Sequence, residues 1–146
     1  MTCPRNNRYR KSTAVINNPN LQTLAANDYV AFTGSNVTGE SIEFNAGTTP
    51  VKLVQQGLYE VTVNANLIGT AAGVVTLQLF NNNTAVQDAV ASVTTAAGDN
   101  YNAGFTTVIE VLPYCYCNVN TANLQVQVQT TGVDVANAAI TVVKLA

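Results

Sequence analysis

The chain has 146 residues, a length typical of one domain, and only 10% of them are charged. It contains no histidine, which excludes the Ser–His and Cys–His pairs of the common nucleophilic enzymes. No apolar run reaches the ~18 residues of a membrane-spanning helix, and the polar start does not resemble a signal peptide.

The basic residues gather at the start of the chain. Residues 1–12, MTCPRNNRYRKS, hold four of the six basic residues, so the remainder has two against eight acidic ones and a net charge of −6. Blocks of like charge at a terminus are often interaction tails, whereas four basic groups are too few to favour nucleic acid. We therefore predict an arm that anchors the protein to an acidic surface of another protein through Arg5, Arg8, Tyr9, Arg10 and Lys11.

Residues 13–28 are predicted to connect this arm to the body of the protein. They begin with a short apolar alternation, Thr13–Ile16, which is typical of a strand. The stretch that follows, NNPNLQTLAAND, is interpreted as a loop or as one helical turn from Leu21 to Ala26. The body itself is predicted to be one domain formed by residues 29–146.

Alternation of apolar and polar residues dominates the body of the chain. It is clearest in LYEVTVNANLI at 58–68 and in LQVQVQ at 124–129. Turn chemistry separates the alternating segments, as in the predicted turn from Thr33 to Asn36. We expect an all-β jelly-roll sandwich of about ten strands, formed by Thr13–Ile16, Tyr29–Thr33, Ser41–Asn45, Val51–Val54, Leu58–Ile68, Val74–Phe80, Thr84–Val93, Tyr101–Leu112, Leu124–Gln129 and Ala138–Leu145.

No catalytic or metal-binding constellation accompanies these strands. The sequence lacks the GxSxG, phosphate-loop and HExxH motifs. Most acidic residues are interpreted as solvated positions on strand faces. We therefore expect no enzyme, no cofactor and no metal.

The three cysteines leave two interpretations open. Cys115 and Cys117 share one face of a strand about 7 Å apart, too far for an easy disulfide between them. An odd number of cysteines favours pairing between chains. One hypothesis is that Cys3 reaches Cys115 or Cys117, in the same or a neighbouring subunit; the alternative is three free thiols.

The stretch PVKLVQQGLYEVTVNANLIG at 50–69 has an apolar strand, with Val51 and Leu53, followed by the Gly57-x-Tyr59 start of a long strand. NAAITVVKLA at 137–146 is similar to a closing strand. Together they resemble the trimeric jelly rolls of the tumour necrosis factor and complement type, most closely bacterial spore-surface glycoprotein domains and phage structural proteins. The resemblance implies a compact homotrimer whose long central strands face the three-fold axis.

This resemblance also suggests roles for particular residues. On 58–68 it implies a trimer interface or core strand formed by Tyr59, Val61, Val63 and Leu67. The Ala-rich stretch 84–98, in which Asp88 is the single charged residue, requires cover, because bare apolar β-surface aggregates. A closed three-fold assembly would provide that cover.

The leading functional expectation is a non-enzymatic structural protein. It is a trimeric surface decoration or head or tail fibre protein of a bacteriophage virion, held to a capsid or other virion protein by the N-terminal arm. Two alternatives remain: a spore-surface or spore-appendage subunit of a Gram-positive bacterium, on the outside of the cell, and a carbohydrate-binding adhesion module that binds a host-surface glycan. We expect no membrane partner in any of the three.

Overall fold

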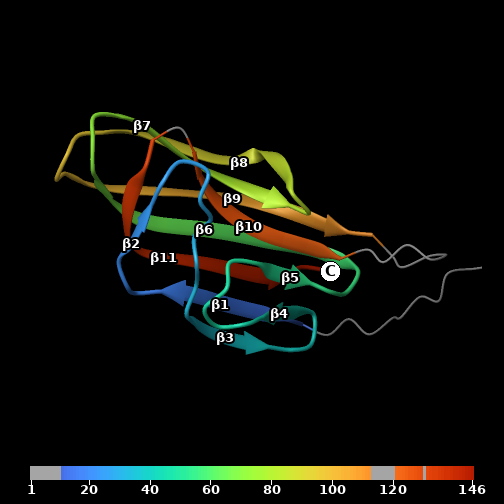
Figure 1. The fold of residues 1–146 in the computed structure, drawn as a ribbon. Helices are drawn as coiled ribbons and strands as arrows, with labels where there is room; N and C mark the ends of the chain where they lie inside the picture. The colour runs from blue at the N-terminus through green and yellow to red at the C-terminus, as the bar shows by residue number, and fades with distance from the viewer. Residues whose placement is uncertain (1–10, 113–120, 130) are drawn as a thin grey trace, which may run out of the picture.

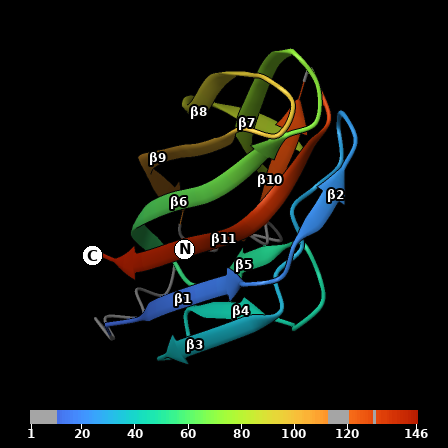
Figure 2. The same ribbon diagram turned by 90° about the vertical axis from the view of Figure 1, so that its left-hand side faces the viewer.

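The computed structural model describes residues 11–112, 121–129 and 131–146. These residues form two antiparallel β-sheets that pack face to face (Figures 1 and 2). Sheet A has the order β3 (Gly34–Thr38), β1 (Thr13–Asn18), β11 (Val133–Lys144), β6 (Gly57–Gly69) and β9 (Asn100–Val111), with β2 (Gln22–Leu24) added to one end of β11. Sheet B has the order β4 (Ile42–Phe44), β5 (Val51–Leu53), β10 (Ala122–Gln129), β7 (Gly73–Asn81) and β8 (Thr84–Thr95).

The chain crosses repeatedly between the two sheets, and this connectivity is that of a jelly roll. From β5 onward the strands lie in sheets B, A, B, B, A, B and A. No helix occurs among the described residues. The prediction of an all-β jelly-roll sandwich is confirmed, with eleven strands in the described part of the chain instead of about ten.

The core forms where the alternating strands of the two sheets face each other. On β6, every second side chain from Tyr59 to Leu67 is buried, with at most 2% of its surface exposed. On β10 of the opposite sheet, Leu124, Val126 and Val128 are buried in the same way. The period-two pattern therefore sets which side of each long strand points inward.

Three local predictions in the first third of the chain are wrong. Residues 21–26 form no helical turn, because β2 runs there and pairs with β11. Within the expected turn at 33–36, residues 34–36 are instead the start of β3, which pairs with β1. Residues 29–33 form no strand and contribute only two isolated bridges, Tyr29 to Gln127 and Phe32 to Thr48.

The segment expected to connect arm and body contributes to the sandwich. Within 13–28, β1 pairs with both β11 and β3, and β2 pairs with β11. Ala14 and Ile16 of β1 are fully buried. In the described structure, the sandwich therefore includes residues from Thr13 onward.

The two long sides of the sandwich end in different strands. One side is bordered by β8 of sheet B and β9 of sheet A, and the other by β4 and β3 (Figure 2). Each of these four strands has one partner within its sheet. Each therefore presents one backbone edge that no described strand covers.

Gly57 is required where β6 begins beside the last residues of the chain. Its φ is +148°, and a Cβ there would collide with the carbonyl oxygen of Ala146, whose position is fixed by a 3.1 Å hydrogen bond from the Leu58 N–H. Gly98 has a φ of +83°, but a Cβ there would have open space around it. An alanine at Gly98 would therefore suffer backbone strain alone, whereas an alanine at Gly57 would suffer both backbone strain and a collision.

We expect Gly57→Ala to destabilise the fold more than Gly98→Ala. Gly98→Ala introduces backbone strain alone, about 1 kcal/mol, whereas Gly57→Ala adds a displacement of the C-terminal strand worth at least about 1 kcal/mol more. Urea unfolding with linear extrapolation measures both changes. Equal losses of stability in the two variants would show that the expected collision between a Cβ at residue 57 and the Ala146 carbonyl oxygen does not occur.

Candidate interaction surfaces

The described residues hold no group of three or more His, Cys, Asp or Glu side chains that could bind a metal ion. In the same part of the chain, no helix has the length and apolar character needed to cross a membrane.

Most residues of the predicted anchoring arm lie outside the described structure. Lys11 is described, and its side chain is exposed directly before the buried Ser12. The following predicted residues lie outside the described ranges, and their roles stay predictions: Arg5, Arg8, Tyr9 and Arg10 of the arm, and the cysteines Cys3, Cys115 and Cys117.

The described residues that flank these segments lie at one end of the sandwich (Figure 1). Ser12, before β1, accepts a 2.9 Å hydrogen bond from the Lys144 N–H near the end of β11. Lys144 is aligned with Tyr59 of β6, and Gly57 is aligned with Val111, where β9 ends. We call this end, where β1 begins and β9 ends, the arm end.

A buried polar cluster fixes the start of β1 at the arm end. Ser12 is 1% exposed, and its Oγ accepts a hydrogen bond from the Ser41 N–H at 3.4 Å. The Ser41 hydroxyl donates to Gln55 Oε1 at 2.6 Å, and the Tyr59 hydroxyl donates to the Gln55 carbonyl oxygen at 2.7 Å. The residue that follows Lys11 is therefore joined to the core and is not part of a free tail.

The four residues predicted for a trimer interface or core strand point into the sandwich. Tyr59, Val61, Val63 and Leu67 each have at most 2% of their surface exposed in a single chain. Alternation turns them toward sheet B, so only the opposite side of β6 is available to another molecule. The structure places all four in the core of one chain.

The outer face of sheet A carries an uncharged network of amide side chains. Asn102 Nδ2 donates to Oδ1 of both Asn64 and Asn66 at 2.8 Å, and Asn66 Nδ2 donates to Asn137 Oδ1 at 2.8 Å. One step toward the arm end, the hydroxyls of Thr62 and Thr106 lie 3.1 Å apart. This network crosses three strands, β9, β6 and β11, and holds its amides in one arrangement.

Only part of this network follows from the sequence. The alternation at 58–68 predicts that Asn64 and Asn66 face outward. Their partners do not follow from it, because Asn102 is 38 residues from Asn64 and Asn137 is 71 residues from Asn66, and only the register between the strands brings these residues together.

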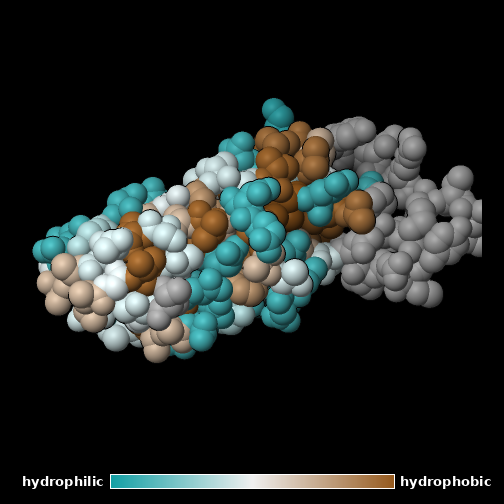
Figure 3. Space-filling model, turned by 90° about the horizontal axis from the view of Figure 1, so that it is seen from above, coloured by the Kyte–Doolittle hydropathy of each residue, from teal (hydrophilic) through white to brown (hydrophobic). Residues whose placement is uncertain are grey.

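The side of the sandwich between β8 and β9 leaves core side chains partly uncovered. Hydrophobic residues that pack on the core but stay half-buried lie along both strands: Val86, Ala91, Val93, Tyr101 and Phe105. Val90 and Val108 add side chains that are 42% and 54% exposed. Figure 3 looks onto this side and shows several groups of hydrophobic residues, the largest of them in the upper right of the view.

The half-buried patch lies on the Ala-rich stretch 84–98 and on its neighbour β9. A row of partly exposed apolar residues along two edge strands is a surface that promotes association. We call it the β8–β9 edge. In the described structure, it is this edge that lacks cover, whereas the apolar side of β6 is already covered within the chain.

Solved structures of other proteins share this architecture. The chain is similar to an Eiger TNF from S. frugiperda, with 10% identity over 92% of each chain and a TM-score of 0.67. It is similar to the globular domain of the zebrafish complement 1qA protein, with 10% identity over 94% of this chain and 98% of that one and a TM-score of 0.68. It is also similar to the PRD1 vertex protein P5, with 13% identity over 92% and 97% and a TM-score of 0.55.

These likenesses show a TNF- and complement-like jelly-roll fold and, at such low identity, nothing beyond the fold. No protein-family model and no curated protein sequence matches the chain. The predicted resemblance to the tumour necrosis factor and complement type is confirmed at the level of fold.

Tyr59 links the polar cluster at the arm end to a pH dependence of stability. Burial raises the pKa of Tyr59 above its ordinary value of 10.0. The folded protein therefore holds the phenol proton more tightly than the unfolded chain does. The stabilisation is fully present below pH 10 and is lost as the pH rises through the raised pKa.

We expect Tyr59→Phe to lower stability at pH 7 by about 1 kcal/mol, because the Gln55 carbonyl loses its donor. Above pH 10, the wild type should lose stability more steeply than Tyr59→Phe, as measured by melting temperature between pH 7 and 11. Tyr29→Phe is the control, since that ring packs on Phe80 at a half-exposed position. Parallel pH profiles for wild type and Tyr59→Phe would contradict this role.

Proposed function

We propose that this protein is a non-enzymatic structural protein: a homotrimeric surface decoration or fibre protein of a bacteriophage virion, anchored by its N-terminal arm. The observation that carries the proposal is the β8–β9 edge, an apolar surface that a single chain leaves half-covered. The fold likeness to the PRD1 vertex protein P5 supports a place on a viral particle.

The proposed trimer joins two different surfaces. The β8–β9 edge of one chain packs against the outer face of sheet A of the next, so that each chain contributes both an edge and a face. A contact between unlike surfaces closes into a ring when its rotation is one-third of a turn. The uncharged amide network suits the buried part of such a contact, because its amides already pair with one another and leave few groups to desolvate.

The trimer is tested by placing a charge in the proposed contact. We expect Val108→Glu to convert a trimer into monomers, because it buries an unpaired carboxylate beside Glu60, its neighbour in register on β6. Val108 is 54% exposed, so the single chain should still fold. Light scattering after gel filtration at micromolar concentration measures the mass.

The matched control for this charge is Val74→Glu, on the outer face of sheet B. Val74 is 46% exposed on β7, so the change is chemically the same and lies outside the proposed contact. Val74→Glu should remain a trimer. A trimeric Val108→Glu, or a wild type that stays monomeric, would refute the assembly.

The basic arm supplies the attachment in this proposal. Its last residue, Ser12, is joined to the core at the arm end, so a contact made by the arm restrains the whole domain. Three arms per trimer bind together, which allows each single contact to be weak. The remainder of the chain, with a net charge of −6, would then face away from the acidic partner.

Deletion of residues 2–10 should abolish binding to the particle while the trimer stays folded. The deletion stops before Lys11 because Ser12 contributes to the buried cluster. Co-sedimentation with stripped particles measures occupancy, and the control replaces only Asn6 and Asn7 with Ser, which keeps every basic residue. Binding of the wild type should weaken as the salt concentration is raised. If the truncated protein decorates particles at full occupancy, the proposed anchoring role of the arm is wrong.

A further inference from the structure

A groove of about 450 Å³ lies on the side of the sandwich away from the β8–β9 edge. It is lined from β3 and β4, the outermost strands of the two sheets, and from the loop that joins β4 to β5. Figure 2 shows β3 and β4 side by side at this side of the molecule. The volume is within the range of sites that bind small organic ligands.

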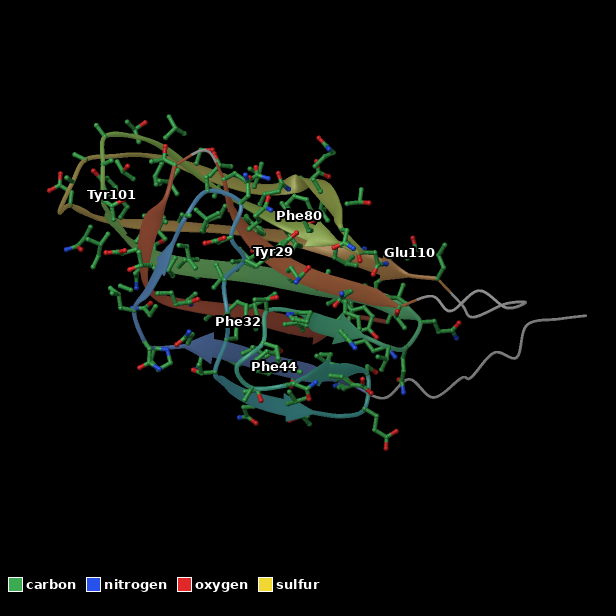
Figure 4. All side chains as sticks on the ribbon, viewed as in Figure 1. Tyr29, Phe32, Phe44, Phe80, Tyr101 and Glu110 are labelled. Atoms are coloured by element: carbon green, nitrogen blue, oxygen red, sulfur yellow. The ribbon has the colours of Figure 1, made fainter. Side chains whose placement is uncertain are left out.

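Part of the groove lining is apolar and includes an aromatic ring held in place. Val37 of β3 and Phe44 of β4 line it, and both are half-buried. The ring of Phe44 meets the ring of the fully buried Phe32 edge-on, with centroids 6.4 Å apart and an interplanar angle of 78° (Figure 4). Phe32 therefore packs against one side of the Phe44 ring, and another side of the same ring lines the groove.

Polar residues that line the groove, which we call its rim, carry both hydrogen-bond donors and acceptors. Glu43 of β4 and Lys52 of β5 stand opposite one another in register, and both side chains are exposed. No ion pair joins these two residues in the structure, so both charges are available to a ligand. Asn45 and Thr48 add an amide and a loop fixed by a 2.6 Å hydrogen bond from Thr48 Oγ1 to the Asn45 carbonyl oxygen.

We propose that this groove binds a saccharide. A sugar ring presents hydroxyl groups that both donate and accept hydrogen bonds, which matches a rim holding a carboxylate, an ammonium and an amide. It also presents a C–H face that packs against an aromatic ring such as Phe44. One ligand class thereby satisfies both halves of the groove.

Other ligand classes fit this groove less well. A wholly apolar ligand would cover Glu43 and Lys52 without giving them partners. A phosphate or other compact anion would meet the carboxylate of Glu43. An extended peptide could pair with the open edge of β3 or β4, and it is kept as the competing outcome in the experiment. The groove does not depend on the proposed trimer or on the basic arm.

The test uses the full chain and a defined set of sugars. Glucose, galactose, N-acetylglucosamine and N-acetylneuraminic acid, each as the free sugar and as an oligosaccharide, are titrated while the methyl signals of Val37 and the ring signals of Phe44 are followed by NMR. We expect at least one of them to shift both sets of signals. Glu43→Gln and Asn45→Ala should then weaken its binding about tenfold or more, since each removes a group of the rim.

The control variant is Asp99→Asn, which makes the same kind of change in the turn between β8 and β9 and should leave binding unaltered. A response to oligosaccharides alone supports a longer glycan, and a response to the free sugar supports a terminal residue. The proposal is overturned if none of these sugars shifts the groove signals, if Glu43→Gln binds as the wild type does, or if the signals respond only to an added peptide.

Discussion

The period-two alternation of the long strands is the constraint on which the rest of the structure depends. On β6, each apolar residue from Tyr59 to Leu67 is turned toward sheet B, and each residue between them is turned outward. A shift of one residue in register would exchange the two sets, so the buried face fixes the pairing of β6 with β9 and β11. That pairing in turn determines which polar residues become neighbours on the outside, and the amide network of Asn64, Asn66, Asn102 and Asn137 is its direct product.

A strand can be predicted from the sequence where its own residues show the alternation and the β-branched side chains typical of strands. These two features coincide over many positions in β6, β7, β8, β9 and β10, and the sequence therefore predicts these five strands. In contrast, β2 and β3 are short and polar, and they exist because β11 and β1 offer paired backbone partners. The groove between β3 and β4 could not be predicted either, because β3 has no signal of its own and the two walls, 34–38 and 42–44, belong to different sheets.

The two sides of the sandwich, one bordered by β3 and β4 and the other by β8 and β9, differ in how their open strand edges are protected. Along β3 and β4, the edge strands are short and carry charged or polar side chains at the surface, which is a common way to discourage pairing with another chain. Along β8 and β9, both strands are twelve residues long and the core residues between them are half-covered. Only 10% of the residues are charged, so the chain has few charged side chains that could protect a long edge from pairing with another chain. The asymmetry favours association at β8–β9 and exposure at β3–β4, and this division is what allows the proposed trimer and the proposed saccharide groove to coexist.

The position of the arm adds a mechanical argument to the proposed anchoring. Ser12 is held from two directions, by the Lys144 N–H of β11 through its carbonyl and by the Ser41 N–H through its hydroxyl. The strand that follows is paired with β11 on one side and β3 on the other over most of its length. A force on the arm directed away from the arm end acts along β1, so it loads many interstrand hydrogen bonds at once instead of opening them one after another. An attachment at this position can therefore transmit strain to a particle without first peeling β1 from the sheet.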